Sequence, residues 1–121
     1  MIKISGPDFI GLQVRDVPAA AEFYEKVVGL TPAPVAVPGA TVFATEPIPF
    51  AVRQAAVDLD SVERLGWGTA LWFRCDDAQA LHDQLVGSGV QIAAEPFDGP
   101  FGRTFAFVDV DGYTITVHDK G

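Results

Sequence analysis

The second half of the chain repeats the first. Residues 9–16, FIGLQVRD, align residue for residue with residues 70–77, ALWFRCDD, and a helical pattern ending at glycine follows each segment. An internal repeat constrains a fold strongly, because each copy is expected to form the same supersecondary unit. We therefore expect one domain over residues 1–121, built from a first module over about 1–60 and a second over about 66–121, with a cleft between the copies.

Each copy opens with a strand followed by a helix. In the first copy residues 9–14 form the strand, and Asp16 stands where a helix N-cap is expected. Apolar side chains then recur at helical spacing as far as Gly29, which is expected to end the helix. Strand-like runs follow at residues 40–45 and 49–54.

The second copy carries the same signals. Residues 70–75 form its first strand, and Asp77 caps a helix that stops at residues 87–89. The Asp111-Gly112 pair is typical of a tight hairpin turn. The remaining strands are expected at residues 90–93, 103–108 and 113–118. We predict an α+β protein in which each copy reads β-α-β-β-β.

Composition excludes several classes of protein. Sixteen acidic and 8 basic residues give a net charge of −8, which argues against nucleic-acid binding. The single cysteine, Cys75, excludes an intrachain disulfide and a cysteine-based zinc site, and we expect it to be a small buried apolar residue. No signal peptide and no apolar run of membrane-spanning length is evident, so a cytoplasmic protein without membrane partners is expected.

Several motifs occur together in a known order. The opening strand with its aspartate, the pairs Phe23-Tyr24 and Gly29-Leu30, Gly102-Arg103, and the D-V-D-G run at residues 109–112 follow one another along the chain. Together they resemble the vicinal oxygen chelate superfamily of glyoxalases, bleomycin-resistance proteins and extradiol dioxygenases, over nearly the whole chain. The resemblance implies the glyoxalase/bleomycin-resistance fold, with two βαβββ modules forming a curved mixed sheet around a cleft, and a homodimer.

Enzymes of that superfamily hold a divalent metal, and the resemblance implies which positions would bind it. Those positions are Phe9, Ala70, Thr116 and, in the first copy's last strand, Ala51 or Arg53. A divalent metal needs three or four imidazole, carboxylate or thiolate donors, and these residues supply none. Of the two histidines, His82 is expected to be a solvated helix residue, and His118 ends the last strand. We therefore predict no metal and no other cofactor.

Strand alternation predicts what faces the cleft instead. The candidate ligand-binding residues are Phe9, Gln13, Arg53, Trp72, Arg74, Thr114 and Thr116 on strands, and Trp67, Phe101 and Arg103 in loops; His118 is expected on the same face as Thr116. The aromatic residues and the arginines can each have a purely structural role in place of ligand binding. Phe9 and Trp72 can be core aromatics and Trp67 a loop anchor. Arg103 can be a surface arginine, and the other two arginines can form ion pairs at a dimer interface.

The leading functional hypothesis is a metal-independent protein that sequesters a small aromatic or peptide-like compound, with possible antibiotic resistance. This follows the resemblance to bleomycin-resistance proteins, in which acidic dimers stack a cationic antibiotic on aromatic side chains. Arg53 and Arg74 do not suit a cationic ligand, so the ligand's charge stays open. The alternatives are a metal-dependent lyase, isomerase or dioxygenase, a cofactorless enzyme, and a non-catalytic subunit. No recognised catalytic motif is present, so no catalytic residue is assigned.

Overall fold

The computed structural model describes residues 2–120. The chain divides into two compact units, residues 1–59 and 60–121, which we call the first and second modules. The elements of the first module are β1 (Ile10–Val14), α1 (Val17–Glu22), η1 (Phe23–Val28), β2 (Ala40–Phe43) and β3 (Phe50–Gln54). A short helix, η2 (Leu59–Ser61), follows. The elements of the second module are β4 (Leu71–Arg74), α2 (Ala78–Gly87), β5 (Ile92–Gly99), β6 (Gly102–Val108) and β7 (Thr114–His118).

The helix of the first module begins and ends where the sequence predicts. Asp16 Oδ1 accepts a hydrogen bond from the backbone N–H of Ala19 at 3.0 Å, as an N-cap does. Gly29 ends the helix with a φ of 99°, a value that favours glycine. Between these ends α1 widens into the π-helix η1, and the N–H groups of Gly29 and Leu30 both reach the carbonyl of Tyr24.

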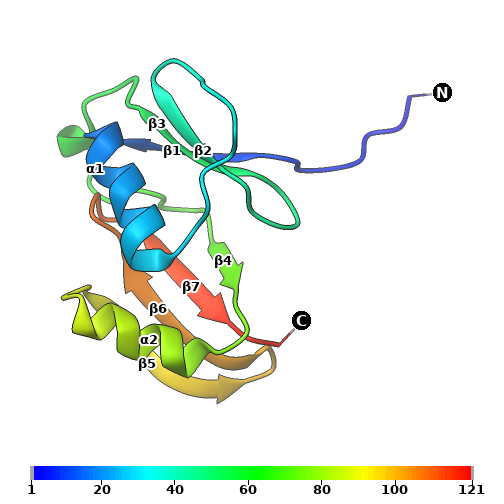
Figure 1. Ribbon diagram of the computed structural model, residues 1–121, viewed down its shortest axis with the longest axis vertical. Coiled ribbons are helices and arrows are strands. Elements are labelled where there is room, and N and C mark those ends of the chain that lie inside the picture. The colour runs from blue at the N-terminus through cyan, green and yellow to red at the C-terminus, as the bar shows by residue number, and fades with distance from the viewer. Residues whose placement is uncertain (1, 121) are drawn as a thin grey trace. The chain divides into compact units, whose positions relative to one another are not determined.

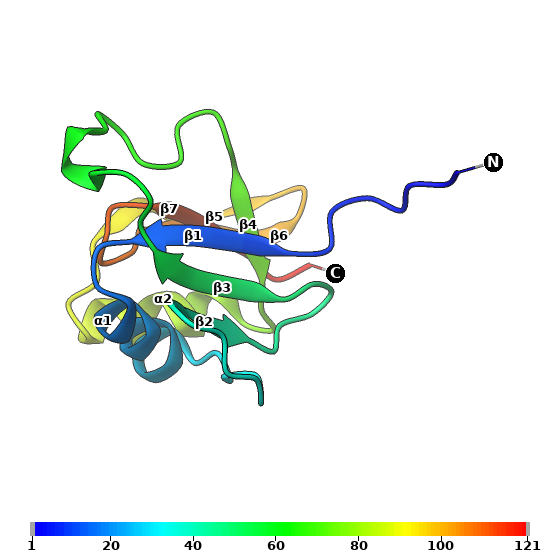
Figure 2. The same ribbon diagram turned by 90° about the horizontal axis from the view of Figure 1, so that it is seen from above.

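The sheet of the first module has the order β1-β3-β2, with β1 parallel and β2 antiparallel to β3. The helix α1 packs on one face of this sheet (Figures 1 and 2). Tyr24 is fully buried, and its ring lies 5.1 Å from that of Phe23 and 5.0 Å from that of Phe50. This aromatic core fixes which face of the three strands is internal.

The first module has two strands after its helix, where β-α-β-β-β requires three. The chain from Thr31 to Ala33 runs along the outer edge of β2, with Ala33 N–H donating to Val42 and Ala44 N–H donating to Thr31, both at 2.8 Å. Pro32 lies between them and makes only an isolated bridge. The hydrogen bonds to β2 are made by the residues on either side of Pro32, so its ring nitrogen lies on the outer side, as proline requires at a sheet edge. The missing strand is reduced to this bridge.

The second module has the full β-α-β-β-β pattern. Its strands lie in the order β4-β7-β6-β5, with β4 parallel to β7 and the other pairs antiparallel. The helix α2 packs on β5 and β6 (Figure 1), and Asp77 caps it by accepting a hydrogen bond from Ala80 N–H at 3.0 Å. The strand β5 is longer than predicted, and its two register shifts against β6 allow it to continue through Pro96.

The Asp111-Gly112 turn joins β6 to β7 as the sequence predicts. Asp109 is nearly buried, and its Oδ1 accepts hydrogen bonds from the N–H groups of Asp111, Gly112 and Tyr113, each at 2.9 Å. One side chain therefore satisfies three backbone donors and fixes the hairpin.

His82 is not the solvated residue expected. Its side chain is only 13% exposed and packs edge-on against Phe105 on β6, with the ring centroids 5.4 Å apart. Its Nδ1 lies 2.9 Å from a carboxylate oxygen of Asp83. The prediction was wrong because this turn of α2 faces the sheet, which the sequence pattern alone did not indicate.

The structure confirms the α+β class and the tandem arrangement of strand–helix–strand modules. The grouping of both modules into one domain stays a prediction. Within residues 2–120, no helix has the length and apolar character needed to cross a membrane.

Candidate ligand-binding surface

Three aromatic side chains of the second module meet at the end of its sheet. Trp72 comes from β4, Phe101 from the turn between β5 and β6, and His118 from β7. Their ring centroids lie 5.6 to 6.0 Å apart, in edge-to-face pairs. Trp72 is 49% exposed and Phe101 is 54% exposed, so large apolar surfaces remain open. We call these three residues the aromatic cluster.

Strand register explains why the aromatic cluster forms. Trp72 is paired with Thr116, and Arg74 is paired with His118, across the parallel strands β4 and β7. Paired residues point to the same face of a sheet, so these four side chains share one face. This face is opposite α2. His82 of α2 packs on Phe105, so Phe105 points to the helix side of the sheet and its neighbour Ala106 points to the other side. Ala106 is paired with Thr116, so Thr116 lies on that other side as well.

The position of Phe101 depends on the close approach of two backbone segments. Gly102, with a φ of 87°, turns the chain into β6. Lys120 N–H donates to the carbonyl of Phe101 at 3.0 Å, and the Asp119 carboxylate accepts a hydrogen bond from Arg103 N–H at 2.9 Å. The segment after β7 therefore holds the turn that presents the Phe101 ring.

His118 contains an unsatisfied polar atom. Its Nδ1 is closed to solvent and has no hydrogen-bond partner among the described residues. Leaving a buried polar group unpaired costs about 1–3 kcal/mol, so such an atom calls for a specific explanation. The predicted set of ligand-binding residues omitted His118, although strand alternation had placed it on the face of Thr116.

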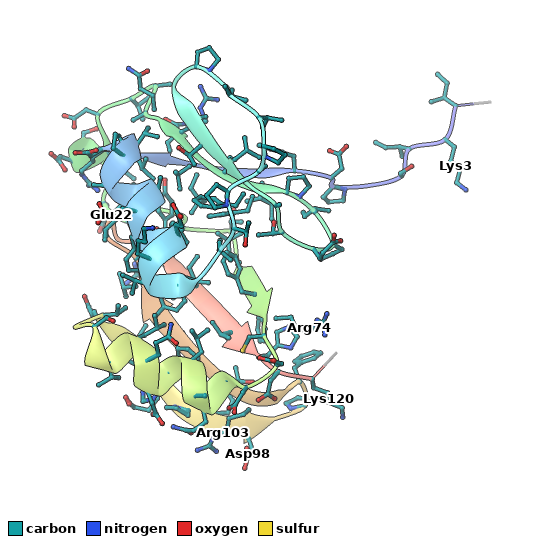
Figure 3. The ribbon with its side chains drawn as sticks, viewed as in Figure 1. Lys3, Glu22, Arg74, Asp98, Arg103 and Lys120 are labelled. Carbon is teal, nitrogen blue, oxygen red and sulfur yellow. The ribbon has the colours of Figure 1, made fainter. Side chains whose placement is uncertain are left out.

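Arg74 and Arg103 lie in different surroundings. Arg74 is exposed and makes no ion pair or hydrogen bond with any residue of the described part of the chain. Figure 3 shows Arg74 and Lys120 at the same end of the sheet. Arg103 instead pairs with Asp98 at 3.2 Å and donates to Gln79 of α2 at 3.1 Å, so its side chain lies on the helix side of the sheet. It does not join Trp72.

Two of the predicted residues of the first module lie close together. A Cβ atom placed on Gly11 would lie 3.5 Å from the Phe9 ring and 3.9 Å from Cδ of Arg53, so these two side chains flank the same glycine. Phe9 is 51% exposed. Gln13 is already engaged, because its Oε1 accepts a hydrogen bond from Ala56 N–H at 2.7 Å.

Of the remaining predicted residues, two lie on the face of Trp72 and one lies away from it. Thr114 and Thr116 lie on β7, two residues apart and on the face of Trp72. Trp67 stands apart from the aromatic cluster, is 74% exposed, and is covered by the guanidinium of Arg64 at 4.6 Å from its ring centroid. In the second module Trp72, Arg74, Thr114, Thr116 and His118 thus share one face of the sheet, and Phe101 meets Trp72 and His118 at its end.

The sequence left two residues, Ala51 and Arg53, as the metal-ligand position on the last strand of the first copy, and the strand register distinguishes them. Gly11 pairs with Ala51 as Trp72 pairs with Thr116, and Gly11 and Trp72 are equivalent in the repeat. Ala51, not Arg53, is therefore the counterpart of Thr116.

The four positions Phe9, Ala51, Ala70 and Thr116 hold no imidazole, carboxylate or thiolate, so they do not fit a divalent metal. Across residues 2–120, no three His, Cys, Asp or Glu side chains are grouped as a metal site would need.

The fold and these motifs define a protein of the vicinal oxygen chelate class. Residues 6–117 match the model of the Glyoxalase/Bleomycin resistance protein/Dioxygenase superfamily, and the chain belongs to that family. No curated protein matches the chain by sequence.

Solved structures share this fold. An integron cassette protein from the mobile metagenome of V. cholerae is 26% identical with a TM-score of 0.73, over 100% of this chain and 99% of that one. TnmS3, an antibiotic binding protein from Streptomyces sp. CB03234, is 25% identical with a TM-score of 0.73, over 100% of both chains. The fosfomycin resistance protein FosX from Mesorhizobium loti is 21% identical with a TM-score of 0.73, over 98% of this chain and 95% of that one, and shows likeness of fold alone.

Proposed function

We propose that this protein binds and sequesters a small aromatic or peptide-like compound without using a metal. The observation that carries the proposal is the aromatic cluster, in which Trp72 and Phe101 are each about half exposed beside polar side chains. Apolar walls with a few placed polar groups are typical of small-molecule sites. Exposed indole and phenyl rings offer flat surfaces on which a planar ligand can stack.

The similarity to TnmS3 supports an antibiotic as the compound. That protein is an antibiotic binding protein, and the likeness extends over both chains completely. Binding alone can protect a cell, because each bound molecule is removed from its target. The proposal therefore includes a role in antibiotic resistance, and a homodimer in the cytoplasm that needs no metal.

The test begins with a panel of aromatic and peptide antibiotics, examined by native mass spectrometry and then by calorimetry. Trp72→Ala is expected to weaken binding of the compound found by at least about tenfold, the usual effect of removing a central aromatic contact. Trp72→Phe should retain part of the affinity. Val86→Ala is the matched control, because Val86 is 50% exposed on α2 and lies away from the aromatic cluster.

An unchanged affinity in Trp72→Ala would overturn stacking as the mechanism. Elemental analysis of protein prepared without chelators tests the metal-free part of the proposal, and one divalent metal per chain would contradict it. Light scattering at several concentrations gives the oligomeric state, and a monomer at every concentration would contradict the homodimer.

A second candidate is a cofactorless lyase or isomerase of the same family. The unpartnered Nδ1 of His118 favours it, since a general base needs an imidazole nitrogen free to accept a proton. Incubating the bound compound with the protein distinguishes the two functions. A sequestering protein returns the compound unchanged, whereas an enzyme yields a product of altered mass or retention time, and His118→Gln abolishes its formation.

A further inference from the structure

We propose that the ligand is a planar aromatic molecule carrying an acidic group, which Arg74 and His118 bind while Trp72 and Phe101 hold the rings. This inference rests on the proposed function and specifies the charge of its ligand. It also makes His118 a ligand-binding residue, and it excludes the cationic ligands that an acidic protein would suggest.

The geometry brings the two polar residues together. Arg74 and His118 are register partners on β4 and β7, and adjacent strands lie about 4.8 Å apart. Both side chains share the face of Trp72, whose ring centroid is 5.8 Å from that of His118. An acidic substituent on a ring stacked against Trp72 would therefore lie within reach of both.

The state of Arg74 supports an anion. The chain carries 16 acidic and 8 basic residues, yet Arg74 has no ion pair or hydrogen bond with any residue from 2 to 120. A guanidinium presents a planar set of donors that matches a carboxylate with two parallel hydrogen bonds. Lys120 adds a second positive charge at this end of the sheet (Figure 3). The net charge of −8 opposes an anion only weakly here, because salt screens exposed charges beyond about 8–10 Å.

His118 supplies the second polar contact. Its Nδ1 is unpaired and closed to solvent, so a ligand oxygen that bonds to it would satisfy a group that the protein leaves unsatisfied. Because this atom is closed to solvent, a neighbouring group must move for the oxygen to arrive. Phe101 has room to do so, because it is 54% exposed and lies in the turn between Gly99 and Gly102. Binding is therefore expected to rotate the Phe101 side chain, while the turn itself stays held by Lys120 and Asp119.

The experiment compares two probes of nearly the same shape, 2-naphthoate and the neutral 2-naphthamide, by calorimetry and by chemical-shift changes in labelled protein. The wild-type protein is expected to bind naphthoate at least tenfold more tightly. Arg74→Gln should lower naphthoate affinity to that of naphthamide, and His118→Phe, which keeps an aromatic ring, should lower it at least threefold. Lys26→Gln is the control, because it removes the same charge from an exposed site in η1.

The outcomes separate the two proposals. Equal affinity for both probes, with Trp72→Ala abolishing both, would overturn the acidic ligand and leave stacking intact. An equal loss of naphthoate binding in Lys26→Gln and Arg74→Gln would also overturn the acidic ligand, because it would show a general effect of charge. Absence of binding by either probe at millimolar concentration would overturn the acidic aromatic ligand, whereas the proposed function is overturned only if no member of the antibiotic panel binds.

Discussion

The carboxylate of Asp119 lies in contact with Gly102, at the point where β6 begins. One oxygen accepts a hydrogen bond from Arg103 N–H at 2.9 Å, and the other accepts one from Ala78 N–H, at the start of α2, at 3.1 Å. A Cβ atom on residue 102 would overlap this carboxylate. A single side chain thus joins the end of β7, the start of β6 and the start of α2, next to the turn that carries Phe101.

Gly102→Ala is expected to destabilise the protein by about 1–3 kcal/mol, because alanine is strained at a φ of 87° and its Cβ would displace the Asp119 carboxylate. Urea unfolding measures the change. Gly68→Ala is the matched control, since Gly68 has a φ of 89° and no atom within 4 Å of its added Cβ. Equal losses in the two variants would show that backbone strain alone acts and that the contact with Asp119 does not matter.

Phe105 should contribute far more stability than an exposed phenylalanine of the same sheet. It is fully buried, whereas Phe97 on β5 is 49% exposed. Phe105→Ala is expected to cost about 3–5 kcal/mol, and Phe97→Ala much less, because only the buried ring leaves a cavity. Comparison of the two unfolding midpoints in urea tests this, and similar midpoints would contradict the internal position of Phe105.

Hydrogen bonding to His82, and then to Gln79, lowers the pKa of the Asp83 carboxyl below its ordinary value of 3.8. An acid with a lowered folded-state pKa stabilises the fold above its ordinary pKa, and this contribution is lost as the pH falls through the lower value. Carboxyl chemical shifts followed by NMR should show Asp83 titrating below pH 3.8, and His82→Phe should raise that midpoint. An unchanged midpoint in the variant would exclude His82 as the cause.

Burial raises the pKa of the Cys75 thiol above its ordinary value of 9.0. The thiolate is the reactive form, so alkylation by iodoacetamide at pH 8 should be slower in the folded protein than in protein unfolded by urea. The midpoint of the rate against pH should lie above 9.0 in the folded protein. Equal rates in folded and unfolded protein would contradict this environment for Cys75.

Local signals predicted the elements because their causes lie within a few residues. Asp16, Asp77 and Gly29 act on neighbouring backbone groups, and the hairpin at Asp111 depends on Asp109 two residues before it. Strand alternation likewise placed Trp72 and Thr116 on one face, once the more apolar side of each strand was assigned to the core. These features need no knowledge of distant contacts.

Other features depend on contacts that local patterns do not contain. The burial of His82 follows from its packing on Phe105, and the direction of Arg103 follows from Gln79 and Asp98. The widening of η1 had no signal that distinguishes it from an ordinary helix. The unpaired Nδ1 of His118 could not be predicted either, since it depends on which neighbours fail to supply a partner.

Gly11 occupies in β1 the place that Trp72 occupies in β4, and its surroundings leave room for a side chain. A Cβ there would meet only the Phe9 ring and Arg53 at ordinary contact distances of 3.5 and 3.9 Å. The two copies of the repeat thus differ at equivalent positions, with a bulky ring at Trp72 and no side chain at Gly11. A substitution at residue 11 therefore alters the surface of the first module while the second module keeps its own rings unchanged.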